Sequence, residues 1–469
     1  MKKIVSTLLT LFGGTLAGLA QQSLTLEQCR QMALQSSENV KIADKQFGQA
    51  TAERQAAFAA YLPKISATGS LTYVFRDIEM STYLPTFVPD IATAQLKPNL
   101  MPHPITPTTP VIGPDGNPVF NMYAYLPMEV SIRGAYMAGI VVEQPIFAGG
   151  KIIAGNKMAK LGVEMADQNR AMQRANVMVE TDRAYWIYVA VGEKVKILEK
   201  YSRLLDFLDS VTATGYSIEM ASKNDLLKVQ ARRGAVSYDL QRARNGLELA
   251  RMSLCRIVGL GYDEQILPAD SPTQITPPPL PEADSSVTVT ARPEYRILQK
   301  QVEMKSLNTK MVRADFLPVV GIGAGYSYLS GAKISGQEMS LKLPYAMLSV
   351  NIPLFHFGEG LRKIKSARLQ QEASRLELEK NAKLLELELR QISRDMQDAY
   401  TLVSTAERAL EQASEALRVS SDSYEVGMET LVNLLDAQAQ WQQAHSNLIE
   451  ARTNFKIKET EWLKATGKF

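Results

Sequence analysis

The sequence predicts an α+β membrane protein built from an internally duplicated unit of helix, strand, strand, helix and helix. The first observation behind this class is a repeat: residues 145–259 recur as residues 353–467, an offset of 208 (353 minus 145). The second is a change from helical to alternating hydrophobic spacing, which occurs after Pro63 and again after Pro318. The third is the great length of the helical stretches without proline inside each copy.

Identical residues at both ends of the repeat establish its register. The pairs at this offset include Pro145 and Pro353, Phe147 and Phe355, Gly150 and Gly358, Tyr216 and Tyr424, Leu226 and Leu434, Gln230 and Gln438, Arg244 and Arg452, and Gly259 and Gly467. A second match, between residues 40–63 and 295–318, has an offset of 255 (295 minus 40). The difference between the offsets, 255 minus 208, indicates an insertion of 47 residues in the first copy.

The beginning of the chain has the features of a secretory signal peptide, which we assign to residues 1–20. Lys2 and Lys3 precede an apolar stretch that ends in small residues before Gln21. The first cysteine, Cys29, lies beyond the expected cleavage point, so we expect no lipid anchor there. No uncharged apolar run of ~18 residues follows, so a membrane crossing would require strands.

Composition and charge exclude several classes of function. The formal charge of +3 falls to +1 when the two lysines of the signal peptide are removed, so nothing indicates a nucleic-acid partner. His103, His356 and His445 are scattered, and no nucleophile–base–acid pattern is recognisable. Residues 148–151 lack the spacing of a phosphate-binding loop. We therefore expect no metal site, no cofactor and no enzyme activity.

The two cysteines, Cys29 and Cys255, both fall in amphipathic segments where a small apolar residue would serve. Export would permit a disulfide between them. Two buried free thiols are the favoured interpretation.

The first repeat covers residues 21–260. Its predicted elements are a helix at 23–60 that starts near Thr25, strands at about 64–76 and 132–145, a proline-rich outer loop at 77–131 between them, and a long helical hairpin at 150–259. A proline-rich connector at residues 261–292 follows.

The second repeat covers residues 293–469. Its predicted elements are a helix at 293–315, strands at about 318–329 and 342–353, and a long helical hairpin at 358–467. The first arm of each hairpin is free of proline over ~64 residues, which corresponds to ~95 Å of helix. No single globular core needs a helix of that length.

The predicted strands suit a membrane, although a half-buried hairpin in a soluble domain is the alternative. Their apolar and polar residues alternate, so each strand has one apolar face. Strands of about 11–13 residues, tilted by ~45°, can cross a hydrocarbon core of ~30 Å. The signal peptide favours the membrane, and so does an aromatic set that resembles an interfacial girdle: Tyr73, Phe75, Tyr136, Tyr326 and Tyr328.

Four strands cannot close a barrel, and open strand edges are not tolerated in lipid, so the chain is expected to oligomerise. Two copies would give eight strands with a filled interior. Three copies would give twelve strands and room for a pore.

Several segments, taken in order, resemble the TolC-type outer-membrane efflux proteins. They are the signal peptide, the opening at residues 24–28, the strand entry Tyr61-Leu62-Pro63, the strand exit at residues 144–150 and the hairpin turn at residues 424–438. Their order within a duplicated frame is specific, and the resemblance spans essentially the whole mature chain.

The resemblance implies a homotrimer whose twelve-stranded β-barrel sits in outer-membrane lipid and continues as a twelve-helix periplasmic α-barrel. It also implies two partners, a periplasmic adaptor (membrane fusion) protein and an inner-membrane transporter. The implied function is the exit duct of a tripartite efflux pump, which passively conducts small molecules or drugs from the periplasm to the exterior. A type I protein-secretion duct is the alternative within the family. A secreted coiled-coil scaffold or adhesin without a pore is the alternative from a different class.

The resemblance further implies a periplasmic gate just beyond the hairpin turns. The two aspartates that family members carry there correspond to Asn433 and Asp436, and the first-repeat counterparts are Asp225 and Lys228. Three copies of Asp436 would form a constriction that attracts cations. The ring at Asn433 has lost its charge, which weakens cation trapping, and an ordinary solvated aspartate is the alternative role for Asp436.

The hairpin turns themselves correspond to the tip that contacts the adaptor. Gly427 and Met428 occupy this place in the second repeat, and Glu219 and Met220 occupy it in the first, which lacks the glycine. The alternative role for Gly427 is merely to permit a tight turn.

Overall fold

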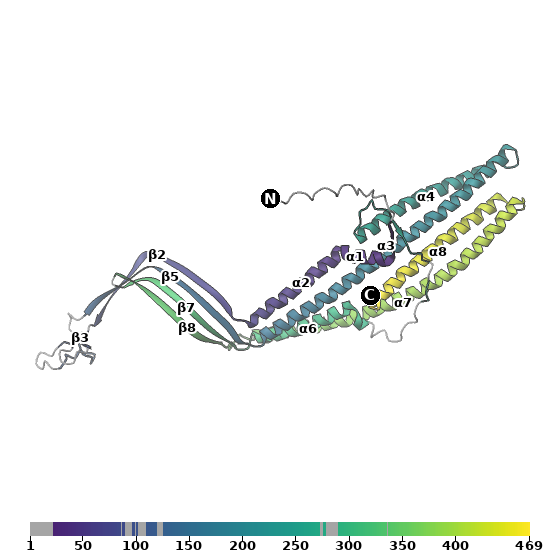
Figure 1. The fold of residues 1–469 in the computed structure, drawn as a ribbon. Helices are drawn as coiled ribbons and strands as arrows, with labels where there is room; N and C mark the ends of the chain where they lie inside the picture. Colours follow the sequence, from purple (N-terminus) through teal and green to yellow (C-terminus); the bar gives the residue numbers. More distant parts are fainter. Residues whose placement is uncertain are drawn as a thin grey trace, which may run out of the picture. The chain divides into compact units, whose positions relative to one another are not determined.

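The computed structural model describes residues 22–85, 87–89, 96–98, 100–101, 109–119, 125–272, 275–277, 289–334 and 336–469 (Figure 1). The predicted signal peptide lies outside these residues, and so do parts of the predicted outer loop and connector. The chain divides into two compact units. The helical unit comprises Met1–Arg54, Lys157–Leu307 and Ala367–Phe469, and the sheet unit comprises Gln55–Asn156 and Asn308–Ser366.

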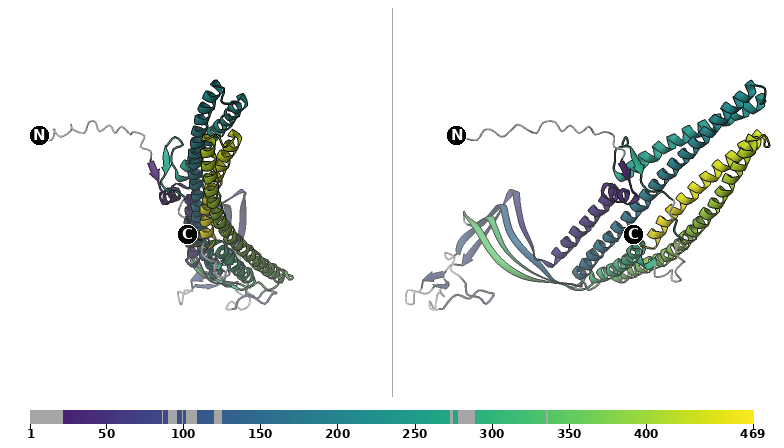
Figure 2. Two further views of the ribbon diagram at one scale, coloured as in Figure 1. Left: turned by 90° about the vertical axis from the view of Figure 1, so that its right-hand side faces the viewer. Right: turned by 45° about the vertical axis from the view of Figure 1, so that its right-hand side comes forward.

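Two long helical hairpins repeat one another. The first consists of α3 (Lys151–Ser217) and α4 (Lys223–Val258), and the second consists of α7 (Glu359–Glu425) and α8 (Leu431–Ala465). Helices α3 and α7 have 67 residues each, which corresponds to ~100 Å. The two arms of each hairpin run side by side (Figure 2). The first residues of α3 and α7 differ by 208 (359 minus 151), so the repeat in the sequence is also a repeat in the structure.

An ion pair between the two arms is duplicated with the sequence. Arg244 of α4 donates to Glu199 of α3 over 2.8 Å, and Arg452 of α8 donates to Glu407 of α7 over 2.9 Å. Both members shift by 208 (407 minus 199 and 452 minus 244), so the arms of the two hairpins are held in the same register. Partly exposed pairs of this kind contribute only ~0–1 kcal/mol, so they mark the register more than they stabilise it.

A four-stranded antiparallel sheet joins the two repeats. Its order is β2 (Lys64–Pro85), β5 (Tyr125–Ala148), β7 (Val319–Ile334) and β8 (Gln337–Asn351). The pair β5–β7 connects the repeats, and β2 and β8 form the two edges of this sheet.

The strands of the first repeat extend beyond their predicted bounds. Strand β2 reaches Pro85 rather than about residue 76, and β5 begins at Tyr125 rather than about residue 132. The interpretation of residues 77–131 as an irregular loop is therefore wrong at both ends. A two-stranded sheet, β3 (Phe87–Pro89) and β4 (Leu96–Pro98), also lies inside it. Proline misled the prediction, because Pro85 is the last residue of its strand, where a missing N–H costs little.

The strands of the second repeat are also longer than predicted. Strand β7 runs to Ile334 and β8 begins at Gln337, so most of the segment expected to connect them is strand. The turn between them contains Gly336, whose φ of 83° lies in the left-handed region that favours glycine. Glycines interrupt the alternation of side chains here, and the pattern therefore ended the strands too early.

The helices that precede the strands are α1 (Leu26–Ser36), α2 (Glu38–Phe58) with the 3₁₀ turn η1 (Ala59–Tyr61), and α6 (Pro293–Ala314). The single helix predicted over residues 23–60 is wrong, because Ser37 leaves the helical conformation and separates α1 from α2. Thr25 begins α1 as expected. Its hydroxyl accepts the Gln28 N–H over 3.3 Å, and the Gln28 side chain accepts the Thr25 N–H in return.

A small parallel strand pair precedes α1. Strand β1 (Gln22–Leu24) pairs with β6 (Ile266–Pro268), which lies in the predicted proline-rich connector. The Tyr185 hydroxyl donates to the Leu24 carbonyl over 3.1 Å, and the Tyr188 hydroxyl donates to the Ile266 carbonyl over 2.6 Å. Both tyrosines belong to α3, so this helix fixes the pair. Three-residue strands are too short to show a period, which is why they were not predicted.

The largest buried cluster of the helical unit surrounds these tyrosines. Its members are Leu24, Cys29, Tyr185, Trp186, Tyr188, Val189, Leu254, Cys255, Val258 and Ile266. The two thiols are free and buried, as expected. Burial raises the pKa of Cys29 to about 12, and it also raises the pKa of Cys255. Both groups therefore behave as small apolar side chains at neutral pH.

A buried acid ties the two repeats together. Asp182 of α3 is fully buried, and it accepts hydrogen bonds from the Arg30 guanidinium of α1 at 2.7 Å and 2.5 Å. It also accepts a hydrogen bond from the Thr460 hydroxyl of α8 over 2.7 Å. This charge is paired and hydrogen-bonded from two helices, which is the condition for a tolerable buried ion.

We predict that Asp182→Ala strongly destabilises the helical unit. The substitution removes the buried partner of the largely buried Arg30 guanidinium and leaves it only the weaker contact with exposed Glu27 over 3.3 Å. Removing one partner of a buried pair costs ~3–5 kcal/mol in comparable sites. Glu193→Ala is the matched control, because Glu193 pairs with Lys196 at the surface and should cost less than ~1 kcal/mol. Thermal unfolding followed by circular dichroism measures both. Equal melting temperatures for the two variants would contradict the prediction.

Candidate functional site: the hairpin turns and the faces of the sheet

The two hairpin turns have the same backbone. In the first, the Met220 N–H donates to the Gly215 carbonyl over 2.8 Å, and in the second the Met428 N–H donates to the Ser423 carbonyl over 2.8 Å. This bond, reaching back across the last helical turn, is the Schellman ending of a helix. The residue before each methionine, Glu219 or Gly427, adopts the left-handed conformation such an ending requires.

Glu219 is strained where its counterpart is relaxed. Its φ is 59°, and the φ of Gly427 is 75°. A side chain in this region costs ~1 kcal/mol that glycine does not incur. Gly427 therefore allows the turn to form without backbone strain, whereas the first repeat makes the same turn with Glu219.

Each turn displays apolar side chains to solvent. Met220 is 83% exposed and Met428 is 84% exposed, and the preceding Ile218 and Val426 are exposed as well. Exposed apolar groups at equivalent places of both repeats indicate a contact surface. Methionine suits such a surface, because its flexible thioether adapts to a partner's shape.

The structure assigns local roles to the predicted gate residues of the first repeat. Asp225 lies in the first turn of α4. Its backbone N–H donates to the Ser222 hydroxyl over 3.1 Å, and its carboxylate accepts from that hydroxyl over 2.7 Å. Lys228 lies 3.7 Å from the Asp225 carboxylate. The charge of Asp225 is thus offset within its own helix.

The second repeat differs at these positions. Asn433 takes the place of Asp225, and its N–H donates to the Thr430 hydroxyl over 3.3 Å. Its side-chain amide donates to Glu429 over 2.5 Å. Asp436 is exposed one turn later and accepts from the Gln440 amide over 2.6 Å. Asp436 therefore keeps its negative charge where the first repeat has the cation Lys228.

The hairpins meet just behind the turns. Leu208 of α3 and Val229 of α4 form one buried cluster with Leu431 and Leu434 of α8. The predicted gate residues thus lie on helices held together in one apolar cluster. Sequence reasoning did not find this contact, because the four positions belong to different repeats.

The sheet has two chemically different faces. Cross-strand partners point to the same face, and the register places large apolar residues on one side: Ile65, Leu71, Ile140, Val142, Ile322, Leu348 and Val350. The opposite side is mixed. It carries small and hydroxyl residues (Ser66, Thr68, Ser70, Gly139, Gly321, Gly323, Ser327 and Ser349) and also larger apolar ones (Met137, Val141, Leu329, Leu341, Leu343 and Met347). The aliphatic face is exposed in the single chain, which a soluble sheet would not tolerate.

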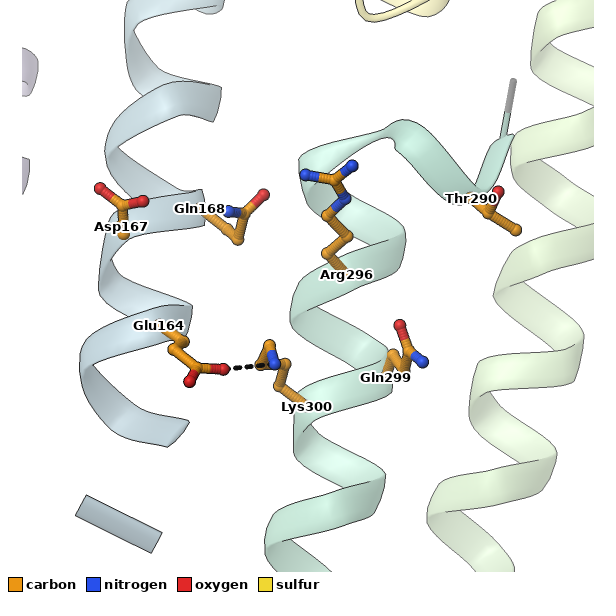
Figure 3. A pocket seen from close by; sticks show the side chains of 7 residues that line it. All are labelled: Glu164, Asp167, Gln168, Thr290, Arg296, Gln299 and Lys300. Carbon is orange, nitrogen blue, oxygen red and sulfur yellow. Dashed lines mark ion pairs between the residues drawn. The ribbon is translucent and has the colours of Figure 1, made fainter. Parts of the chain in front are cut away.

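A polar recess of about 360 Å³ lies between α3 and α6 (Figure 3). Glu164 and Lys300, which line it, form an ion pair. The other lining residues are Asp167, Gln168, Thr290, Arg296 and Gln299. Acidic and basic side chains both line the recess, so it selects neither for anions nor for cations. No group of metal-ligating residues occurs in the described ranges, and none of the helices described there is long and apolar enough to cross a membrane.

Comparisons with known proteins agree with this geometry. Residues 290–468 match the family model described as outer membrane efflux protein. The chain is 22% identical to the alkaline protease secretion protein AprF of Pseudomonas aeruginosa over 331 residues, which cover 68% of this chain and 67% of that protein.

Two solved structures share the fold. Crystal structures of CusC match with a TM-score of 0.73 and 14% identity, over 94% of this chain and 91% of that one. The CmeC outer membrane channel of Campylobacter jejuni matches with a TM-score of 0.70 and 15% identity, over 94% and 85%. Residues 290–468 therefore resemble the outer membrane efflux protein family, and nearly the whole chain shares its fold with solved outer-membrane channels.

Proposed function

We propose that this chain is the outer-membrane exit duct of a tripartite efflux pump. It conducts small molecules or drugs passively from the periplasm to the exterior, and an inner-membrane transporter supplies the energy through a periplasmic adaptor. The observation that carries the proposal is the exposed aliphatic face of the sheet, which suits lipid and lies opposite a mixed face where small and hydroxyl residues occur.

The assembly we propose is a homotrimer. Strands β2 and β8 leave one side of each edge unpaired, and lipid offers no hydrogen bonds to these groups. Pairing β8 of one copy with β2 of the next satisfies them, and three copies give a closed barrel of twelve strands with room for a pore. The helices α3, α4, α7 and α8 of three copies would form the twelve-helix periplasmic wall.

The gate we propose carries one acidic ring. Three Asp436 carboxylates would converge near the threefold axis, whereas Asp225 is offset by Lys228 and Asn433 is uncharged. A single ring attracts cations, but less strongly than the two rings implied by the family resemblance.

The adaptor contact we propose is formed by the hairpin turns, with Met220 and Met428 as apolar anchors. Gly427 and Glu219 set the backbone that presents them. The high exposure of Met220 and Met428 supports this role.

A type I protein-secretion duct is the second candidate. The observation that favours it is the similarity to a relative named as a protease secretion protein. The two functions use the same duct and differ in transporter and cargo. Export of a drug and of a reporter protein by cells with and without this chain separates them. The scaffold or adhesin without a pore has no support from the family.

We predict that the purified protein is a trimer that forms pores. Native mass spectrometry in detergent should give three copies of the chain, because one sheet cannot satisfy its own edges. The same preparation should give discrete conductance steps in planar bilayers. A soluble monomer without conductance would refute the duct.

We predict that Asp436→Asn weakens block of the channel by divalent cations by roughly tenfold, equivalent to about 1.4 kcal/mol. The substitution removes three carboxylates from the proposed constriction and keeps their shape. Asp225→Asn is the comparison, with an expected effect below about twofold. Titration of single-channel current with Mg²⁺ measures both. Identical block in the wild type and Asp436→Asn would remove Asp436 from the gate.

We predict that Met220→Asp combined with Met428→Asp abolishes export in cells that depend on this chain. The charges make burial of the turns against an apolar partner surface unfavourable. Met220→Leu combined with Met428→Leu should retain export, because apolar area is kept. Drug susceptibility is the readout, and the amount of trimer in the outer membrane must be equal. Full resistance with both aspartates in place would exclude the turns as the contact.

A further inference from the structure

The turn between β8 and α7 contains a second strained residue. Phe357 has a φ of 46°, in the left-handed region that a bulky side chain avoids. Its counterpart in the first repeat is Gly149, at the same offset of 208 (357 minus 149), with a φ of 61°. The repeat therefore shows that glycine fits this turn, and that the second copy carries an aromatic ring at a cost in backbone strain.

The ring of Phe357 is not used to fill a core. Phe357 is 88% exposed and Leu354 is 89% exposed, and Phe355 and Leu361 are exposed beside them. The rings of Phe355 and Phe357 lie edge to face, with their centroids 4.7 Å apart. A strained, exposed pair of rings within an apolar patch indicates a surface that something covers.

We propose that Phe355 and Phe357 form an aromatic anchor that lies in the headgroup region of the phospholipid leaflet on the helix side of the sheet. This inference rests on the proposed insertion of the sheet in a membrane. Aromatic rings are enriched at this level of a bilayer, where an apolar group meets polar lipid atoms.

The length of the apolar face argues for lipid as the occupant. Tyr328, in the aromatic set, lies within β7 and pairs with Lys342 of β8. From Lys342 to its end at Asn351 the strand advances by 9 residues (351 minus 342), about 30 Å at ~3.3 Å per residue. With a tilt of ~40° this gives a height of about 23 Å, close to the ~25 Å apolar band of a membrane barrel. Phe355 and Phe357 follow directly, at the other margin.

The residues on both sides of the anchor also suit a lipid surface. Before it, exposed Leu348, Val350 and Ile352 continue the apolar face up to the turn. Arg362 and Lys365, both exposed, follow in the first turns of α7. Cations next to an aromatic margin can contact lipid phosphates.

Fluorescence in lipid vesicles tests the proposal. The probe is Phe357→Trp in vesicles of phosphatidylethanolamine and phosphatidylglycerol, with bromine at carbons 6 and 7 or at carbons 11 and 12 of the acyl chains. The emission gained over the parent should be quenched by both lipids, and more strongly by the shallow bromines. Leu348→Trp, on the apolar face of β8, should be quenched more strongly by the deep bromines. Tyr238→Trp, on exposed α4, should not be quenched.

The outcomes separate this inference from the proposed function. If Leu348→Trp is quenched and Phe357→Trp is not, the sheet lies in lipid and the anchor is wrong; the ring would then pack against a neighbouring copy. If neither is quenched, insertion of the sheet itself fails. A second variant, Phe357→Gly, should insert into vesicles at least about twofold less completely than the wild type while melting in detergent at the same or a higher temperature. Equal insertion would also overturn the anchor.

Discussion

The unpaired edges of the four-stranded sheet are the constraint on which the rest of this molecule depends. The outward-facing backbone N–H and C=O groups of β2 and β8 need hydrogen-bond partners, and an apolar environment supplies none. The aliphatic face of the same sheet is stable only in an environment that excludes water. One chain cannot meet both needs at once, whereas the proposed closed ring of chains in lipid would meet both. In that case assembly would be as much a requirement of folding as of transport.

The sequence made the helical part of the fold predictable and the rest less so. The offset of 208 located both hairpins, because long amphipathic helices leave a strong periodic signal. The strands were placed but ended too early, because proline and glycine at their far ends mimic a loop. The pair β1–β6 and the buried Asp182 were missed. Each depends on partners more than 80 residues away, and a single acid or a three-residue strand carries no local signal.

The family resemblance suggested the candidate site in the second repeat, and counting from the repeat gave its counterparts in the first. Together they located Gly427, Met428, Glu219 and Met220 in the turns, and the structure adds what neither could supply. It reveals the strain at Glu219 and the exposure of the methionines. Ser222 also turns out to cap α4 by accepting the Asp225 N–H, and the Asp225 carboxylate lies near Lys228. These properties arise from backbone angles and neighbours one turn away, which residue identity alone does not specify.

The duplicated ion pairs Glu199–Arg244 and Glu407–Arg452 have a further consequence for symmetry. The two hairpins have nearly the same length and the same register, so their backbones are nearly equivalent. A ring of three chains would therefore approach sixfold symmetry in its helical wall. The side chains depart from it at many positions, and at the turns the differences include Lys228 against Asp436 and Glu219 against Gly427. A partner that offered six identical contacts would therefore meet two alternating kinds of hairpin.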